Sequence, residues 1–223
     1  QAEEAGWVLY LEGSTDLAIL QAFAGRLDHE AAKCLAKPFV HYVANQPQKA
    51  RDLFRGLREA KEDLVGILIT DRLEQPLQDT DVLREMMWKR REIENYLCYP
   101  QVLEAYARSS AEDGEPGGMF TVVEAEKRSE IMKECIRDAT PPRALADITD
   151  RFWTETKASE MYLEPVFDEF FKRLGLKNIL GKSGYHVLAS LVPPELLSGE
   201  VGDKLDAIAE VASQARPSGN TDS

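Results

Sequence analysis

The chain has 223 residues, of which 43% are hydrophobic, and its 27 basic and 39 acidic side chains give a net charge of −12. This composition suits one or two compact soluble domains and excludes a largely disordered protein. No stretch approaches the roughly 18 consecutive apolar residues of a membrane helix. The segment starts without Met or a basic leader, so we expect a cytoplasmic fragment of a longer polypeptide that contacts no membrane. The acidic balance disfavours a purely electrostatic nucleic-acid binder and leaves room for an acidic metal site.

The first hundred residues alternate between strand and helix patterns. Short apolar runs predict three buried strands, at residues 7–11, 39–43 and 64–70. Apolar residues at helical spacing predict helices between them, at 14–27 and about 47–61. Ser14 or Thr15 is the expected N-cap of the first helix. A weaker alternation over KRREIENYL, residues 89–97, predicts a fourth strand, and the whole order predicts an open α/β sheet.

Pro100 opens a different pattern. Helical spacing continues through 101–112 and about 120–174, interrupted by the loop EDGEPGG and by Pro141 and Pro142. We therefore expect four regions, namely the first part of an α/β core at 1–99, a helical insertion at 100–178, a return to the core with C-terminal helices at 179–213, and a flexible tail at 214–223.

Acidic residues stand where the predicted strands end. Glu12 ends the first strand, Asp16 lies in the first turn of the helix that follows, and Asp71 ends the third strand. Ligands of open α/β sheets bind beyond the carboxyl ends of the strands. Carboxylates gathered there repel one another unless a cation bridges them, and Mg²⁺ prefers such oxygen ligands. Alternatively, Asp16 is only a first-turn helix acid and Asp71 only the first residue of a loop.

Glu92 and Glu94 extend this acidic pattern. Residues two apart in a strand point to the same face, so one or both can join the cluster if the fourth strand lies near Asp71. The alternative is a solvated sheet edge, because Lys89, Arg90 and Arg91 are adjacent in the sequence.

The segments LYLEGSTD, ITDR and REIENYL together resemble the TOPRIM domain of the overcoming-lysogenization-defect (OLD) family of prokaryotic nucleases. The resemblance covers most of residues 7–100 and about 180–190. It implies a TOPRIM-like open parallel sheet flanked by helices, with an inserted all-helical subdomain. Glu12 matches the family's glutamate after the first strand, and Asp71 matches the first aspartate of its Asp-x-Asp motif. Leu73 stands where that motif has its second aspartate.

The resemblance also implies further site residues. Asp16 matches an acid one helical turn beyond the glutamate, Glu92 and Glu94 match acids of the IEN segment, and Lys182 in GKSGYH matches a lysine near the metals. A lysine there could neutralise negative charge that develops on a phosphodiester. Two alternatives stay open for Lys182, a surface lysine in a Gly-rich turn and a P-loop, although the glycine spacing and the helical pattern before it disfavour the P-loop.

Two groups of basic residues are candidates for DNA contact. Arg51, Arg55 and Arg58 recur at helical spacing beside the apolar face of the second helix, and Lys89 and Arg90 precede the IEN segment. Basic patches of this kind can follow a phosphate backbone even in an acidic chain. Solvated helix and strand faces are the alternative explanation.

Together these patterns predict a metal-dependent DNA endonuclease that uses two Mg²⁺ or Mn²⁺ ions. Glu12, Asp16 and Asp71 are the expected ligands of one ion, and Asp71 with Glu92 or Glu94 those of the second. The resemblance implies an ABC-type ATPase region N-terminal to this segment in the parent chain, and a homo-oligomer could form through that region. Three alternatives stay open, namely topoisomerase-like or primase-like TOPRIM chemistry, a phospho-acceptor signalling module, and a noncatalytic assembly module, which Leu73 favours.

Overall fold

The computed structural model describes residues 1–111, 119–197 and 199–217. The chain divides into two compact units, one formed by Gln1–Lys89 with Leu197–Ser223 and the other by Arg90–Leu196. The second unit begins before and ends after the segment 100–178 that was expected to be inserted. The predicted loop EDGEPGG and the predicted tail from residue 218 onward lie outside the described residues. None of the helices in the described part combines the length and the apolar character that crossing a bilayer requires.

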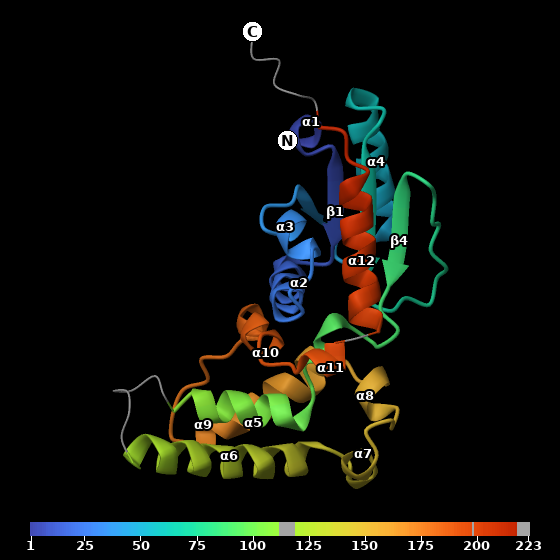
Figure 1. The fold of residues 1–223 in the computed structure, drawn as a ribbon. Coiled ribbons are helices and arrows are strands. Elements are labelled where there is room, and N and C mark those ends of the chain that lie inside the picture. The colour runs from blue at the N-terminus through green and yellow to red at the C-terminus, as the bar shows by residue number, and fades with distance from the viewer. Residues whose placement is uncertain (112–118, 198, 218–223) are drawn as a thin grey trace. The chain divides into compact units, whose positions relative to one another are not determined.

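A parallel sheet of four strands forms the centre of the first unit (Figure 1). Its strands are β1 (Trp7–Leu11), β2 (Val40–Tyr42), β3 (Val65–Thr70) and β4 (Leu83–Met87), in the order β2-β1-β3-β4. Tyr10 of β1 lies opposite His41 on one side and Leu68 on the other. All of β1 and nearly all of β3 are buried, as in parallel strands covered on both faces. The predicted α/β class and the first three strands are confirmed.

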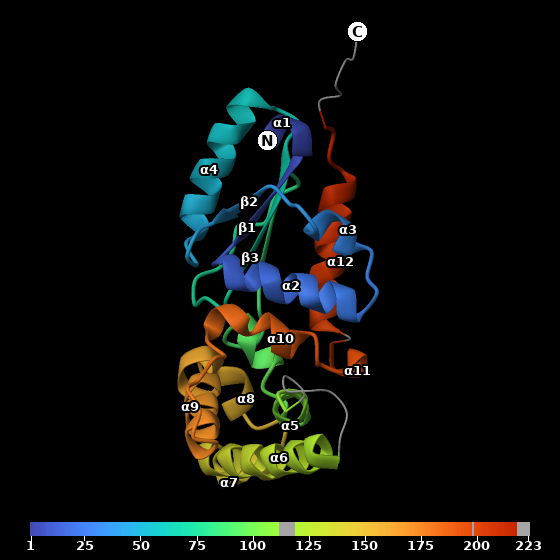
Figure 2. The same cartoon turned by 90° about the vertical axis from the view of Figure 1, so that its left-hand side faces the viewer.

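Helices cover both faces of this sheet. They are α1 (Ala2–Ala5), α2 (Ser14–Arg26), α3 (Ala31–Leu35), α4 (Pro47–Ala60) and α12 (Glu200–Ser213). Figure 2 shows α4 on one face and α3 with α12 on the other. Phe54 of α4 packs into a core with Val8 and Leu68. A Cβ atom at Gly66 would lie only 3.0 Å from the Phe54 ring, so the missing side chain lets α4 approach the sheet closely.

The predicted fourth strand at 89–97 is wrong, because β4 lies earlier, at Leu83–Met87. Within the predicted span, Ile93–Tyr96 form a short 3₁₀ helix, η1, in the second unit. The sequence of β4 is LREMM, in which the charged residues Arg84 and Glu85 interrupt the apolar run that is typical of a buried strand. Glu85 is nevertheless 5% exposed in the sheet, because Arg51 of α4 neutralises its charge.

Every element described in the second unit is helical. After η1 these elements are α5 (Pro100–Ser109), α6 (Met119–Ala139), α7 (Pro142–Ala146), α8 (Phe152–Glu155), η2 (Ser159–Leu163), α9 (Glu164–Arg173), η3 (Lys182–Gly184), α10 (His186–Ala189) and α11 (Pro194–Leu197), whose last residue belongs to the first unit. The core of this unit packs α6 against α5 and α9. Phe167 of α9 meets the Tyr106 ring of α5 edge to face at a centroid distance of 5.2 Å.

Candidate functional site

Three strand ends carry the central cluster of the site. Glu12 follows β1, Asp71 follows β3, and Asn45 lies three residues beyond β2. Because the strand order is β2-β1-β3, these residues meet at the carboxyl edge of the sheet. The Asn45 nitrogen Nδ2 donates to Glu12 Oε2 at 2.8 Å and to Asp71 Oδ2 at 3.0 Å. One amide therefore joins the two carboxylates that the sequence placed at this edge.

A third hydrogen bond sets the orientation of the Asn45 amide. The backbone N–H of Asp71 donates to Asn45 Oδ1 at 3.0 Å. Rotating the amide by half a turn would place its NH₂ group against this N–H, so the nitrogen faces the carboxylates. The two N–H bonds of a neutral amide thus offset part of the repulsion between Glu12 and Asp71.

The loop that delivers Asn45 has an unusual backbone. Ala44 and Asn45 are consecutive residues in the left-handed region, with φ angles of 48° and 56°. This conformation costs an alanine roughly 1 to 2 kcal/mol, whereas Asn adopts it more readily. The sequence analysis missed Asn45. The available signal was an Asn just beyond a predicted strand end, since Asn is one of the few residues suited to such a turn.

Asp16 lies beside Glu12 in the first turn of α2. Its side chain is buried, and its Oδ2 accepts the backbone N–H of Glu12 at 3.2 Å. Burial and then the negative charge of Asp16 raise the pKa of the Tyr42 hydroxyl at the end of β2. The structure therefore places Asp16 at the same edge of the sheet, bound to the backbone that carries Glu12.

The predicted N-cap of α2 is wrong. Gly13, with extended backbone, occupies the N-cap position, and Ser14 is the first helical residue. Within the described residues, no side chain caps this helix by a hydrogen bond. Asp16 instead reaches back past Gly13 to the N–H of Glu12, a favourable place for an acid because the helix N-terminus carries partial positive charge.

The oxygen atoms of Glu12, Asp16 and Asp71 can be compared with the ligand arrangement that a divalent cation needs. The described ranges hold no group of three or more His, Cys, Asp or Glu side chains arranged for a metal ion. Here the amide of Asn45 stands between two carboxylates, while Asp16 binds a backbone N–H. Carboxylate oxygens are nevertheless the ligands that hard cations prefer. With Mg²⁺–O distances of about 2.1 Å, the oxygens around Asn45 Nδ2 would have to move inward by roughly 0.7 to 0.9 Å.

Glu92 and Glu94 belong to the second unit, and their predicted placement in a strand is wrong. Glu92 is the N-cap of η1, and its carboxylate accepts the backbone N–H groups of Asn95 and Ser159. Glu94 lies inside η1 and is 2% exposed. Residues two apart in a 3₁₀ helix are separated by about 240° around its axis, so a shared face cannot be inferred from their spacing.

Lys182 also lies in the second unit, where it meets Glu94. Its Nζ is 3.3 Å from Glu94 Oε1, and 43% of its side chain is exposed. Two residues that the sequence assigned to the catalytic site therefore form an ion pair. A P-loop needs a strand before the lysine and a full helix after it, but residues 176–181 form no strand and η3 spans only three residues. The P-loop alternative does not fit.

The three arginines of the predicted stripe on α4 lie in different environments. Arg51 Nε and Nη2 each donate to one oxygen of the buried Glu85 carboxylate at 2.7 Å. Arg58 donates to the Glu62 carbonyl through Nε at 2.8 Å. Arg55 is 72% exposed, and its Nη1 lies 3.3 Å from an Asp52 oxygen. Arg51 thus links α4 to β4 through Glu85. Arg55 is the residue of this stripe whose exposure best suits contact with DNA.

Lys89 and Arg90 also differ in exposure and in the contacts that their side chains make. The side chain of Lys89 is exposed, while its backbone N–H binds Glu200 Oε1 at 2.7 Å. The Arg90 guanidinium lies 4.5 Å from the centroid of the Tyr96 ring, donates to the Asn95 carbonyl, and binds the Tyr99 hydroxyl. Arg90 therefore stabilises the second unit through intramolecular contacts.

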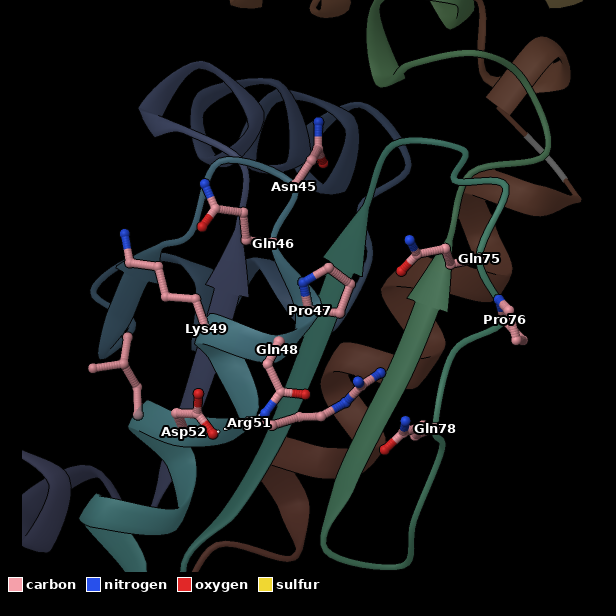
Figure 3. Close-up of a pocket in the computed structure, with 11 residues that line it drawn as sticks. Asn45, Gln46, Pro47, Gln48, Lys49, Arg51, Asp52, Gln75, Pro76 and Gln78 are labelled. Carbon is pink, nitrogen blue, oxygen red and sulfur yellow. Dashed lines mark hydrogen bonds between the residues drawn. The ribbon is translucent and has the colours of Figure 1, made fainter.

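A surface pocket adjoins the acidic cluster. It lies between the N-terminal end of α4 and the segment joining β3 to β4, and its volume is about 1050 Å³ (Figure 3). Asn45 belongs both to its lining and to the hydrogen-bond network of Glu12 and Asp71. The segment joining β3 to β4 contributes Gln75, Pro76 and Gln78 to this lining.

Comparisons with protein-family models, with curated proteins and with solved structures found no match to this chain. The resemblance to the TOPRIM domain of the OLD family therefore stays a prediction.

Proposed function

We propose that the first unit hydrolyses phosphodiester bonds in DNA, with a divalent cation held by Glu12 and Asp71 at the carboxyl edge of a TOPRIM-like sheet. The observation that carries this proposal is the donor shared by the two carboxylates. One nitrogen atom lies within 3.0 Å of an oxygen from each of them. A cation near this position would offset their repulsion with a full charge, where the amide has only partial charges. The parallel sheet and the EGSTD and ITDR segments support the same assignment.

The residues of this edge have distinct proposed roles. Glu12 and Asp71 would hold the cation through carboxylate oxygens, and Mg²⁺ or Mn²⁺ suits such ligands. When bound, the ion would supply Lewis-acid stabilisation of a phosphate and a more acidic water. Asp16 is a positioning residue, because it binds the backbone N–H of Glu12. Asn45 orients both carboxylates, and its amide must shift for the oxygens to close around the ion.

The remaining sequence-based roles stay predictions. Glu92 or Glu94 as ligands of a second ion, and Lys182 as the group that stabilises charge, belong to a different unit from Glu12 and Asp71. Each role has its own test, because Glu92→Gln, Glu94→Gln and Lys182→Ala can be assayed for cleavage separately.

The test of the proposed function is cleavage of two substrates, supercoiled plasmid and a single-stranded DNA circle, in Mg²⁺ or Mn²⁺, with EDTA as a control. Asp71→Asn removes a charged ligand with little change of shape and should lower the rate by about a hundredfold or more. Glu59→Gln is the matched control, since Glu59 is an exposed acid on α4 of the same unit. The proposal is refuted if the wild-type chain leaves both substrates intact in both ions, or if Asp71→Asn cleaves at the wild-type rate.

A noncatalytic assembly module is the second candidate, and a specific observation favours it. The neutral Asn45 amide already bonds both carboxylates, and the partly buried Leu73 replaces an acid of the TOPRIM motif. If the hydrogen bonds of Asn45 to Glu12 and Asp71 only stabilise the fold, Mg²⁺ and Mn²⁺ should leave the melting temperature of the wild-type chain unchanged. An ion-dependent rise that shrinks in Asp71→Asn would instead favour the metal site.

A further inference from the structure

The pocket beside the acidic cluster is lined mainly by side-chain amides. Five of its eleven lining residues carry them, namely Asn45, Gln46, Gln48, Gln75 and Gln78. A carboxamide donates and accepts hydrogen bonds at the same time, so it complements the polar edge of a nucleobase, as in the two-bond pairing of Asn or Gln with adenine. The charged lining residues are Lys49, Arg51 and Asp52, and because Arg51 is paired with Glu85, the charges of Lys49 and Asp52 leave the lining with no net charge in a chain of −12.

The two walls of this pocket face one another with complementary groups. In Figure 3, Gln75 and Gln78 point from the β3–β4 segment toward α4, where Pro47 and Arg51 face them. The saturated ring of Pro47 offers an apolar surface opposite the amides. A base that enters between the walls thus meets both an apolar contact and polar partners for its edge.

The buried carboxylate of Glu85 holds both walls in place. It accepts two hydrogen bonds from Arg51 of α4, and its Oε2 also accepts the backbone N–H of Gln78 at 2.8 Å. Asp79 Oδ1 in turn accepts the backbone N–H of Glu85 at 3.0 Å. The spacing of the walls is therefore set before a ligand binds, which lowers the entropic cost of binding.

The concave shape selects how a base can be presented. A duplex keeps its base edges inside its grooves, where a protruding helix or β-ribbon can read them. Amides that line a pocket reach a base only when it has left the stack, and this costs least in a strand that is already unpaired. Asn45 lines the pocket and binds both Glu12 and Asp71, so the end of the pocket at Asn45 borders the carboxylates.

On the basis of the nuclease function proposed above, we propose that this pocket binds one unpaired nucleotide of a DNA strand. The amides of Gln75 and Gln78 bind the edge of its base, and the adjoining backbone runs toward Glu12 and Asp71. The substrate is then single-stranded DNA or an unpaired strand end, and an intact duplex is a poor ligand.

The test is fluorescence anisotropy in EDTA, where binding is measured without cleavage. The probes are a short fluorescein-labelled oligodeoxyadenylate and the same strand annealed to its complement. The wild-type chain should bind the single strand about tenfold more tightly than the duplex. The double variant Gln75→Ala/Gln78→Ala should weaken single-strand binding by about tenfold, and the backbone bond from residue 78 to Glu85 is retained.

Gln214→Ala is the matched control, because Gln214 is an exposed amide of the same unit outside the pocket. Equal affinity for single strand and duplex would overturn the inference, as would a double variant that binds the single strand as tightly as Gln214→Ala does. Single-strand binding without cleavage in Mg²⁺ or Mn²⁺ would refute the nuclease function and leave the pocket assignment standing. If the chain cleaves a duplex in a metal-dependent way and the Gln75→Ala/Gln78→Ala variant cleaves it equally well, the nuclease function stands and the pocket assignment is refuted.

Discussion

Removing the Asn45 amide should expose the repulsion between Glu12 and Asp71. The two hydrogen bonds, 2.8 and 3.0 Å long, put the carboxylate oxygens at most about 5.8 Å apart (2.8 + 3.0). Two unit charges at this distance repel by about 3 kcal/mol at an effective dielectric constant of about 20. Because both side chains are partly exposed, solvent screening lowers this value, and we expect a loss of about 2 kcal/mol in unfolding free energy.

Two substitutions separate the amide from the backbone. Asn45→Gly removes the amide but favours the left-handed φ of 56°, whereas Asn45→Ala removes the amide and adds backbone strain of roughly 1 kcal/mol. The loss shared by both variants belongs to the amide. Mg²⁺ should raise the unfolding free energy of the glycine variant more than that of the wild-type chain. In the variant the carboxylates can close around an ion directly, whereas in the wild-type chain the Asn45 amide must first move away.

The measurement is urea unfolding in EDTA and in Mg²⁺, followed by tryptophan fluorescence in a Trp153→Phe background. Trp7 and Trp88 lie in the first unit and Trp153 in the second, so the remaining signal reports on the unit that holds Asn45. An Asn45→Gly variant within about 0.5 kcal/mol of the wild-type chain in EDTA would contradict the predicted repulsion.

Three further predictions concern the charged residues. Arg51→Met should lower the unfolding free energy by about 3 kcal/mol in urea titrations, because Glu85 stays buried without its partner, and adding Glu85→Gln should restore part of the loss. Burial raises the pKa of Glu85, but the hydrogen bonds from Arg51 and from the Gln78 backbone N–H, together with the Arg51 charge, outweigh it and leave that pKa below its ordinary value. The pair's contribution should therefore vanish as pH falls through it. The double variant Lys204→Met/Glu200→Gln should raise stability at pH 7, because burial lowers the pKa of Lys204 and the second change removes the carboxylate that would otherwise lose its partner. Wild-type stability should rise with pH up to about 10.4 through this lysine, and the variant should lack that rise. Lys182→Ala should lower single-turnover cleavage about a hundredfold at saturating DNA, and a wild-type rate would leave its ion pair with Glu94 as a structural contact.

The strands that bury apolar side chains on both faces could be predicted from the sequence. A buried parallel strand is an unbroken apolar run, and WVLYL and LVGILIT both have this pattern. The fourth strand could not be predicted in this way, because LREMM carries two charges. Its buried Glu85 depends on Arg51, which lies 34 residues earlier in the chain, and local pattern contains no information on such a pair.

The IEN segment shows the opposite error. Its apolar residues alternate with polar ones, which favours a strand, but Ile93–Tyr96 form a 3₁₀ helix in which Glu92 and Asn95 bond each other's backbone. Asn95 also donates to the carbonyls of Trp153 and Thr156. Contacts with distant parts of the chain therefore decided the conformation of a segment whose local pattern fits a strand.

The sequence by itself determined that Glu12 and Asp71 lie at one edge of a sheet. A residue that directly follows a parallel strand lies at the carboxyl edge wherever that strand is placed. Only the tertiary structure decided that the Asn45 amide joins these two carboxylates, across sequence separations of 33 and 26 residues. That contact requires the strand order β2-β1-β3 and two left-handed residues after β2, and both arise from packing of the whole unit, which no local pattern encodes.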